Sequence, residues 1–142
     1  MPVHIFLDWS GTLCDDAAYS RTVTNIVIRS LGGLEATPEE FRRNSSLTPR
    51  TYLATRIPSE NYPAPDRLEE LFEEAIGLIP LPHLFPGAKE FMECARQHGG
   101  TVSVFSGFQQ NLLERAIDHY GLRALVDHVH GGIDDRRDAL RR

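Results

Sequence analysis

Short apolar runs and longer amphipathic stretches alternate along this chain of 142 residues. Three of the runs are rich in β-branched or aromatic residues and lead directly into polar or glycine-rich turns: residues 3–7, 101–105 and 125–130. Apolar strands that end in polar loops are typical of a parallel sheet covered by helices. The pattern therefore predicts three parallel strands.

The stretches around the second strand have a helical period. Residues 86–99 begin with Pro86, end at a glycine pair, and carry apolar residues at i, i+3, i+4 and i+7, namely Ala88, Phe91, Met92 and Ala95. Residues 108–120 repeat this pattern, with Gly121 as the stop. A path of about 20–25 residues that contains one helix has the length of a βαβ crossover. We therefore expect a helix before and after the second strand.

The first two strands are separated by about 65 further residues in which every signal is helical. Residues 37–40 form a capping box, residues 48–49 open a helix that must end before Pro58, and a third helix starts near Asp66. We expect an α/β core with a Rossmann-like parallel sheet, made of residues 1–14 and 82–142, and an all-helical insertion of residues 15–81.

The composition is that of a soluble globular protein, with 41% apolar residues, 25% charged residues and a net charge of −5. No apolar run approaches the roughly 20 residues of a membrane span, and the acidic balance disfavours nucleic acid as a partner. Cys14 and Cys94 form neither a disulfide framework nor a thiolate zinc pattern. The N-terminus has no basic leader, so we predict a cytoplasmic protein.

Polar residues follow the predicted strands at the end where parallel sheets bind ligands. Asp8 follows the first strand, Ser106 and Gly107 follow the second, and Arg136 lies beyond the third. Asp8 could attack a phosphoryl group and form an aspartyl-phosphate, while the other three groups neutralise the transferring oxygens. The alternative for Ser106 is a helix N-cap ahead of Phe108.

Residues 5–13, Ile-Phe-Leu-Asp-Trp-Ser-Gly-Thr-Leu, resemble the first motif of the haloacid dehalogenase-like hydrolase superfamily, an apolar strand followed by Asp-x-Asp-Gly-Thr-Leu. Phe-Pro-Gly-Ala at 85–88, the helix after it and the strand before Ser106 resemble the approach to the second motif. The helical insertion is similar to the cap domains that close over the active site in this superfamily. The resemblance covers nearly the whole chain.

The resemblance implies a role for each matching residue. Asp8 would be the nucleophile and a Mg²⁺ ligand, the backbone carbonyl of Ser10 a second ligand, Thr12 a support of the loop, and Ser106 a phosphate-binding group. Oxygen ligands of this kind suit Mg²⁺. Trp9 would either line the substrate pocket or pack under the cap. The expected substrate is a small phosphate ester.

The chain departs from the superfamily pattern at two matching positions. Ser10 stands where the phosphatases carry the aspartate that protonates the leaving group, so general acid–base help worth roughly 10²–10⁴ in rate would be missing. Arg136 replaces the usual lysine of the third motif and keeps the charge in a planar form. Lys89 is the only lysine, which excludes the Schiff-base chemistry of the similar phosphonoacetaldehyde hydrolase.

The fourth motif, an acidic pair on a further strand, has no clear counterpart before Arg142, and Asp134 and Asp135 are the candidates to replace it as metal ligands. We therefore expect the C-terminal part of the core sheet to be missing from this chain. The first strand would then have an open edge, which we expect either residues beyond Arg142 or a second copy in a homodimer to cover.

Three functions stay open on this basis. The first is a Mg²⁺-dependent phosphatase, the second a weak or inactive relative that binds a phosphorylated ligand, and the third a 2-haloacid dehalogenase, which needs no Mg²⁺. Two smaller signals are added. Arg56 and other arginines of the insertion are candidates for binding a substrate anion, with solvated helix faces as the alternative, and His128 and His130 share one strand face but have no third zinc ligand spaced near them.

Overall fold

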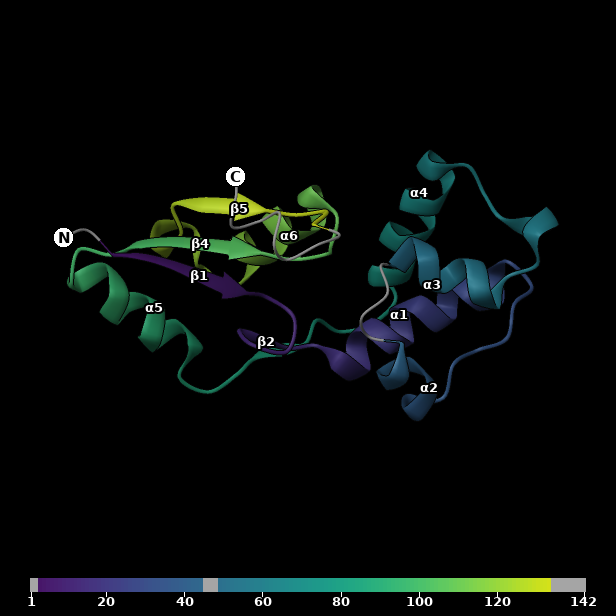
Figure 1. Cartoon of the computed structure of the whole chain (residues 1–142), viewed down its shortest axis with the longest axis horizontal. Coiled ribbons are helices and arrows are strands. Elements are labelled where there is room, and N and C mark those ends of the chain that lie inside the picture. The colour runs from purple at the N-terminus through teal and green to yellow at the C-terminus, as the bar shows by residue number, and fades with distance from the viewer. Residues whose placement is uncertain (1–2, 45–48, 134–142) are drawn as a thin grey trace. The chain divides into compact units, whose positions relative to one another are not determined.

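The computed structural model describes residues 3–44 and 49–133, and the chain divides into two compact units. One unit consists of Met1–Asp15 and His83–Arg142, and we call it the α/β unit. The other consists of Asp16–Pro82, and we call it the helical unit. Figure 1 shows strands in the first and only helices in the second.

The α/β unit contains a parallel three-stranded sheet in the order β1-β4-β5 (Figure 1). Strand β1 spans His4–Asp8, β4 spans Thr101–Phe105 and β5 spans His128–His130. The predicted α/β class with a parallel sheet is confirmed. Strand β5 is shorter than predicted, because Arg123–Leu125 forms a short 3₁₀ helix, η2, ahead of it.

One face of the sheet builds the core of the α/β unit. The strand register places five aliphatic side chains on this face: Ile5, Leu7, Val102, Val104 and Val129. Helix α5, Ala88–Gln97, and helix α6, Gln110–His119, contribute buried residues to the same apolar cluster. Both helices follow the predicted period, since the α-helical repeat brings their apolar residues onto one stripe.

Helix α5 corrects one detail of the sequence prediction. Ala88, Met92 and Ala95 are buried as expected, but the side chain of Phe91 is half exposed. The apolar stripe of α5 is therefore narrower than its sequence indicates, and Phe91 lies at its margin.

The opposite face of the sheet carries aromatic rings and hydroxyls. His4 stacks on Phe6 with ring centroids 4.2 Å apart, its Nε2 lies 2.7 Å from the buried Oγ of Ser103, and His128 and His130 stack at 6.2 Å. Within residues 3–44 and 49–133, no three His, Cys, Asp or Glu side chains gather closely enough to hold a metal ion. His4 and His128 are exposed, so the stacked rings lie at the surface of this face.

Two very short strands, which the sequence did not reveal, stand where the chain leaves and re-enters the α/β unit. Strand β2, Cys14–Asp15, pairs antiparallel with β3, His83–Leu84, and the N–H of Phe85 extends this pairing to the carbonyl of Leu13 at 2.9 Å. Two-residue strands carry no periodic pattern, so only the folded chain shows them. They hold the two connections of the helical insertion together.

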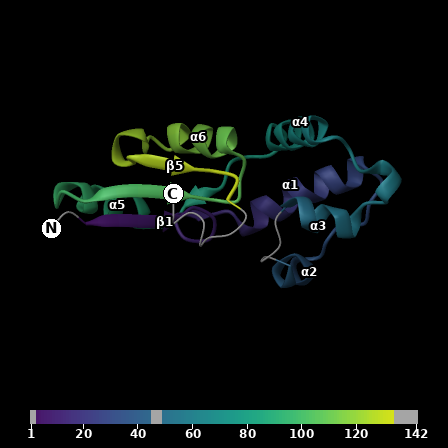
Figure 2. The same ribbon diagram turned by 45° about the horizontal axis from the view of Figure 1, so that its top comes forward.

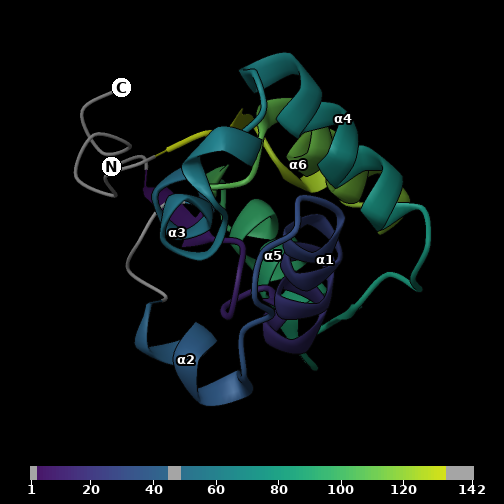
Figure 3. The same ribbon diagram turned by 90° about the vertical axis from the view of Figure 1, so that its right-hand side faces the viewer.

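The helical unit contains α1 (Ala17–Ser30), α2 (Pro38–Arg43), α3 (Pro49–Arg56), the 3₁₀ helix η1 (Ser59–Asn61) and α4 (Pro65–Ile76), as Figures 2 and 3 show. The capping prediction is confirmed, since the hydroxyl of Thr37 accepts a hydrogen bond from the N–H of Glu40.

No helix in the described part of the chain has the length and apolar character needed to cross a membrane.

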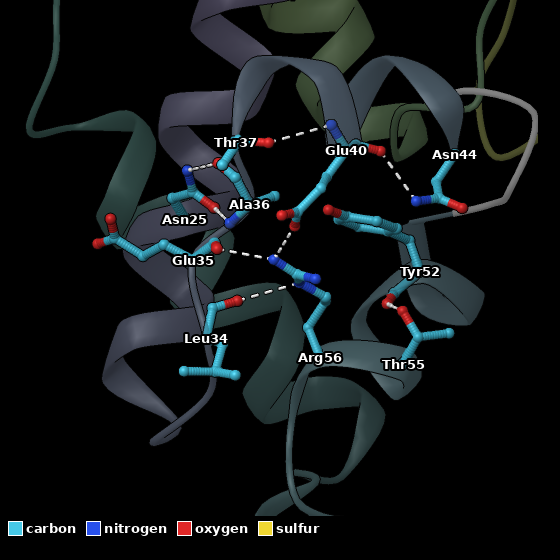
Figure 4. Close-up of polar contacts among 10 residues, drawn as sticks. All are labelled: Asn25, Leu34, Glu35, Ala36, Thr37, Glu40, Asn44, Tyr52, Thr55 and Arg56. Carbon is cyan, nitrogen blue, oxygen red and sulfur yellow. Dashed lines mark hydrogen bonds and ion pairs between the residues drawn. The ribbon is translucent and has the colours of Figure 1, made fainter.

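Arg56 holds the segment between α1 and α2 in place (Figure 4). Its guanidinium donates to the carbonyl oxygens of Leu34 and Glu35, at 3.1 and 2.7 Å, and pairs with the carboxylate of Glu40. These contacts correct our expectation for Arg56, because a guanidinium committed to three internal acceptors serves the fold of the helical unit.

Tyr52 lies beside this ion pair in Figure 4. Its side chain is 4% exposed, and its hydroxyl has no hydrogen-bond partner in the described structure. Burial raises the pKa of the Tyr52 phenol above its usual value. The hydroxyl is thus a buried polar group that costs stability.

Candidate active site

Asp8 is the last residue of β1 and is half-buried. It lies opposite Phe105, the last residue of β4, and the N–H of Trp9 donates to the carbonyl of Phe105 at 3.0 Å. Parallel strands with no stagger at this end bring the loops that follow them to the same edge of the sheet. The loop after Asp8 and the loop that begins with Ser106 are therefore neighbours.

The loop after β1 folds back on the carbonyl of Trp9, which accepts the N–H groups of Leu13 and Cys14 at 3.1 and 3.0 Å. Gly11 has a φ of +75°, a backbone conformation that glycine adopts without strain, and its N–H donates to the carbonyl of Cys14 at 2.9 Å. The side chain of Thr12 is exposed at the tip of this loop. The expected turn after Asp8 is thus a tight, internally bonded loop.

Trp9 is a core residue. Its side chain is 1% exposed, lies in the apolar cluster of the α/β unit, and has its ring centroid 5.9 Å from that of Tyr120. We expected Trp9 to line the substrate pocket or to pack under the cap, and the structure instead shows it packed in the core of the α/β unit. The residue instead anchors the beginning of the loop that carries Ser10.

Ser106 and Gly107 begin the loop after β4. The Oγ of Ser106, a 3% exposed residue, accepts the N–H of Phe108 at 3.1 Å. This is a local turn of the type that serine favours, whereas the N-cap of α6 is Gln109, so the N-cap alternative for Ser106 is wrong. The hydroxyl accepts this bond through a lone pair, which leaves its own proton able to donate, and the neighbouring Gly107 is exposed.

The donors near Asp8 fit a hard cation. The short bridge between Ser10 and Cys14 is formed by the carbonyl of Trp9 and the N–H of Gly11. A carboxylate and a main-chain carbonyl two residues apart are oxygen donors of the kind that Mg²⁺ prefers, with water and substrate completing the shell. Asp8 and Ser10 would hold such an ion.

The predicted Arg136, and with it Asp134 and Asp135, lies outside the described residues. Of the predicted site residues, the structure brings together Asp8, the loop from Ser10 to Thr12, and the Ser106–Gly107 pair at the carboxyl ends of β1 and β4.

Two carboxyl groups with a lowered pKa lie away from this edge. The N–H of Val102, and next Arg96, lower the pKa of Asp127, which stands just before β5 at the opposite end of the sheet. Arg123 lowers the pKa of the exposed Asp118. Both groups belong to contacts that stabilise the fold.

The sequence placed Gly131 in the loop after the third predicted strand but did not single out Gln110, and these two residues connect the loop after β4 to the end of β5. The side-chain amide of Gln110 bonds to the backbone of Val129 and of Gly131. The only signal for them was the glycine pair that follows the third predicted strand, because an exposed glutamine on a helix leaves no pattern in a sequence.

The family model for haloacid dehalogenase-like hydrolases matches residues 3–140. The chain belongs to this family of hydrolases. Among curated proteins no sequence matches it significantly.

Solved structures of this type share the fold. A predicted phosphoglycolate phosphatase from Haemophilus somnus 129pt matches with 15% identity and a TM-score of 0.63, over 96% of this chain and 64% of that one. A mutant of CbbY from Rhodobacter sphaeroides matches with 21% identity and a TM-score of 0.79, over 99% and 72%. A predicted phosphatase from Clostridium acetobutylicum matches with 11% identity and a TM-score of 0.72, over 92% and 61%. The chain thus spans about two thirds of the length of these proteins, and such identities establish the fold alone.

Proposed function

We propose that this protein hydrolyses a small phosphate ester in a Mg²⁺-dependent reaction with Asp8 as the nucleophile. The observation that carries the proposal is the alignment of β1 and β4, which brings Asp8 and the start of the Ser106–Gly107 loop to the same end of two paired strands. A phosphorylated ligand is also supported by the CbbY structures, one of which holds xylulose-(1,5)bisphosphate and another phosphate.

In the proposed reaction, a carboxylate oxygen of Asp8 forms a bond to phosphorus while the bond from phosphorus to the ester oxygen breaks. The leaving alkoxide takes a proton from solvent, and water then cleaves the aspartyl-phosphate to release phosphate and restore Asp8. The hydroxyl of Ser106 and the N–H of Gly107 donate to the phosphoryl oxygens, where negative charge accumulates. Bound Mg²⁺ would lessen the repulsion between the carboxylate and the phosphoryl group.

Ser10 favours a second candidate, a relative that binds a phosphorylated ligand and turns it over slowly or not at all. A serine hydroxyl cannot act as an acid near neutral pH, so the alcohol would leave without a proton from the protein. Water would also attack the aspartyl-phosphate without a general base. The first effect slows the formation of the phosphorylated protein, and the second lengthens its life.

The test compares the wild-type protein with Asp8→Asn on p-nitrophenyl phosphate and a panel of small phosphomonoesters, with and without Mg²⁺. Asp15→Asn is the matched control, because Asp15 is an exposed aspartate on the short strand β2 of the same unit. We expect Asp8→Asn to abolish both turnover and a hydroxylamine-sensitive label from radioactive phosphate ester, and Asp15→Asn to retain both.

Equal residual activity in the wild-type protein and Asp8→Asn would contradict the proposed function. A wild-type protein that binds phosphate but releases none from esters would favour the slow ligand-binding relative. Chloride release from a 2-chloroacid without Mg²⁺ would favour the dehalogenase.

We further propose a cytoplasmic location, supported by the free thiols of Cys14 and Cys94. For partners we propose a small phosphorylated substrate and no nucleic acid, and a second copy of the chain against β1, which pairs on one edge only within the described sheet. Light scattering of the purified protein tests the homodimer, and a strictly monomeric protein would contradict it.

A further inference from the structure

A side chain forms hydrogen bonds to β5 on the side that faces away from β4. The carbonyl of His130 accepts the N–H of Ser106 on the β4 side, so the neighbouring residues Val129 and Gly131 direct their backbone groups to the opposite edge. There the Nε2 of Gln110 donates to the carbonyl of Val129 at 3.0 Å, and the Oε1 of Gln110 accepts the N–H of Gly131. The carboxamide of Gln110 thereby takes the place of a peptide group in an adjoining strand.

Gly131 makes this approach sterically feasible. A Cβ atom at position 131 would stand 2.5 Å from the Cα of Gln110, 2.7 Å from its backbone N, and 2.8 Å from the carbonyl oxygen of Phe108. These are backbone atoms, which cannot swing aside as a flexible side chain could. The start of α6 and the end of β5 are therefore in contact only because residue 131 is glycine.

The same bonds enclose the loop from Ser106 to Gln109. At its start, the carbonyl of Ser106 accepts the N–H of Ile133 at 3.1 Å, and further along the carbonyl of Phe108 accepts the N–H of Gly132. At its end, Gln110 joins the loop to β5 through both atoms of its amide. The loop that carries Ser106 and Gly107 is thus hydrogen-bonded, at its start, middle and end, to β5 and to the residues that follow β5.

We infer that Gln110 is a positioning residue that holds the Ser106–Gly107 loop in the orientation that binds a phosphoryl group. The inference rests on the proposed function, which makes the phosphoryl group the ligand of this loop. Gln110 acts through the backbone of residues 129 and 131, whereas Asp8 stands on β1, which is not a neighbour of β5. Its loss should weaken phosphate binding and leave the attack by Asp8 largely unchanged.

The experiment compares Gln110→Ala with Gln97→Ala, a matched control in which an exposed glutamine at the end of α5 is shortened. Inorganic phosphate is titrated into each protein and followed by backbone amide NMR. We expect Gln110→Ala to raise the Kd for phosphate, and the KM for p-nitrophenyl phosphate, about tenfold, with kcat within about twofold of the wild-type value. Gln97→Ala should change neither constant.

Gln110→Glu adds a readout that a merely structural role would not move. An ionised glutamate accepts the N–H of Gly131 but cannot donate to the carbonyl of Val129, whereas a protonated carboxyl can do both. The Oε1 of Glu114 accepts from the Nε2 of Gln110 at 3.0 Å, so the new carboxylate would also face a like charge. The phosphate affinity of Gln110→Glu, relative to the wild-type protein at the same pH, should therefore recover as the pH falls and the new carboxyl group becomes protonated.

A Kd and KM of Gln110→Ala within twofold of the wild-type values would overturn the inference, even if its melting temperature falls. A wild-type protein that neither binds phosphate nor hydrolyses esters would instead refute the proposed function. In that case, the positioning role of Gln110 is tested by amide hydrogen exchange in the absence of ligand. Gln110→Ala should speed the exchange of the Ser106 and Ile133 amides, and unchanged rates would overturn the role.

Discussion

Asp127 completes the sheet at the end opposite the candidate site. Its N–H donates to the carbonyl of Val102 at 2.8 Å, and its Oδ2 accepts the N–H of Val102 at 2.7 Å. The Nη1 of Arg96 lies 2.6 Å from each carboxylate oxygen. Since β5 begins only at His128, the carboxylate supplies the acceptor that another strand residue would otherwise provide.

The expected cost of Asp127→Ala follows from these contacts. Val102 is fully buried, so its N–H would lose its acceptor away from water, at a cost of about 1–3 kcal/mol. The ion pair with Arg96 adds at most about 1 kcal/mol, because both side chains are partly exposed. Asp118→Ala is the matched control: Asp118 also pairs with an arginine, Arg123, but its side chain is 60% exposed, so solvent screens the pair and its loss should change stability little.

Trp9 provides the assay, because it is the only tryptophan and lies in the core of the α/β unit. Urea unfolding followed by its fluorescence should show a clearly lower midpoint for Asp127→Ala than for Asp118→Ala. Asp127→Asn keeps an acceptor for the N–H of Val102 and should fall between them. Equal midpoints for the two alanine variants would refute the argument that the buried N–H of Val102 dominates.

The pH dependence follows from the pKa of Asp127, which the N–H of Val102, and next Arg96, hold below its usual range. The unfolded chain then binds more protons than the folded one as the pH falls below about 3.9, the ordinary value. The contribution of Asp127 is therefore present above that pH and lost as the pH falls through the lower folded-state pKa. Asp127→Asn should lack this part of the acid sensitivity.

Three further outcomes are expected. Ser10→Asp should raise phosphomonoesterase turnover by about 10²–10⁴ by restoring an acid and base, and an unchanged rate would contradict the role assigned to that position. Gly131→Ala should lower stability by about 1–3 kcal/mol in urea unfolding, because its Cβ meets backbone, whereas Gly107→Ala, whose Cβ would lie 3.6 Å from its nearest neighbour, should cost about 1 kcal/mol or less. Tyr52→Phe should be neutral or stabilising by up to about 1 kcal/mol in a thermal melt followed by circular dichroism, since it removes an unpartnered buried hydroxyl, and a marked loss would show that the hydroxyl has a partner.

The sequence predicted the elements well where a period ran long enough. The stripes of α5 and α6, the strands β1 and β4, and the capping box at Thr37 all follow from local spacing, because each pattern has one regular structure that can bury it. The strands β2 and β3 escaped prediction, since pairs of two residues have no period.

Single side chains were harder to place than elements. Trp9, next to the proposed nucleophile Asp8, was compatible with a substrate pocket or with packing under the cap, and its burial shows that it lies in the core of the α/β unit. Arg56 resembled a free cation, yet three acceptors from the segment before α2 and from α2 itself engage it. Spacing along a chain specifies which face a residue occupies, but the partner on that face comes from another part of the sequence.

The family, the position of Asp8 as the strand-end carboxylate and the departure at Ser10 could all be predicted from the sequence, because a short motif on one strand is a local property. The common end of β1 and β4, where Asp8 lies opposite Phe105 and Ser106 follows, is visible only in the folded chain, since its ladder bond joins residues almost one hundred positions apart. The tertiary structure also decided that Gln110 acts as a strand edge for Val129 and Gly131. Such contacts depend on where two distant backbones meet, and hydrophobic periodicity does not encode that meeting point.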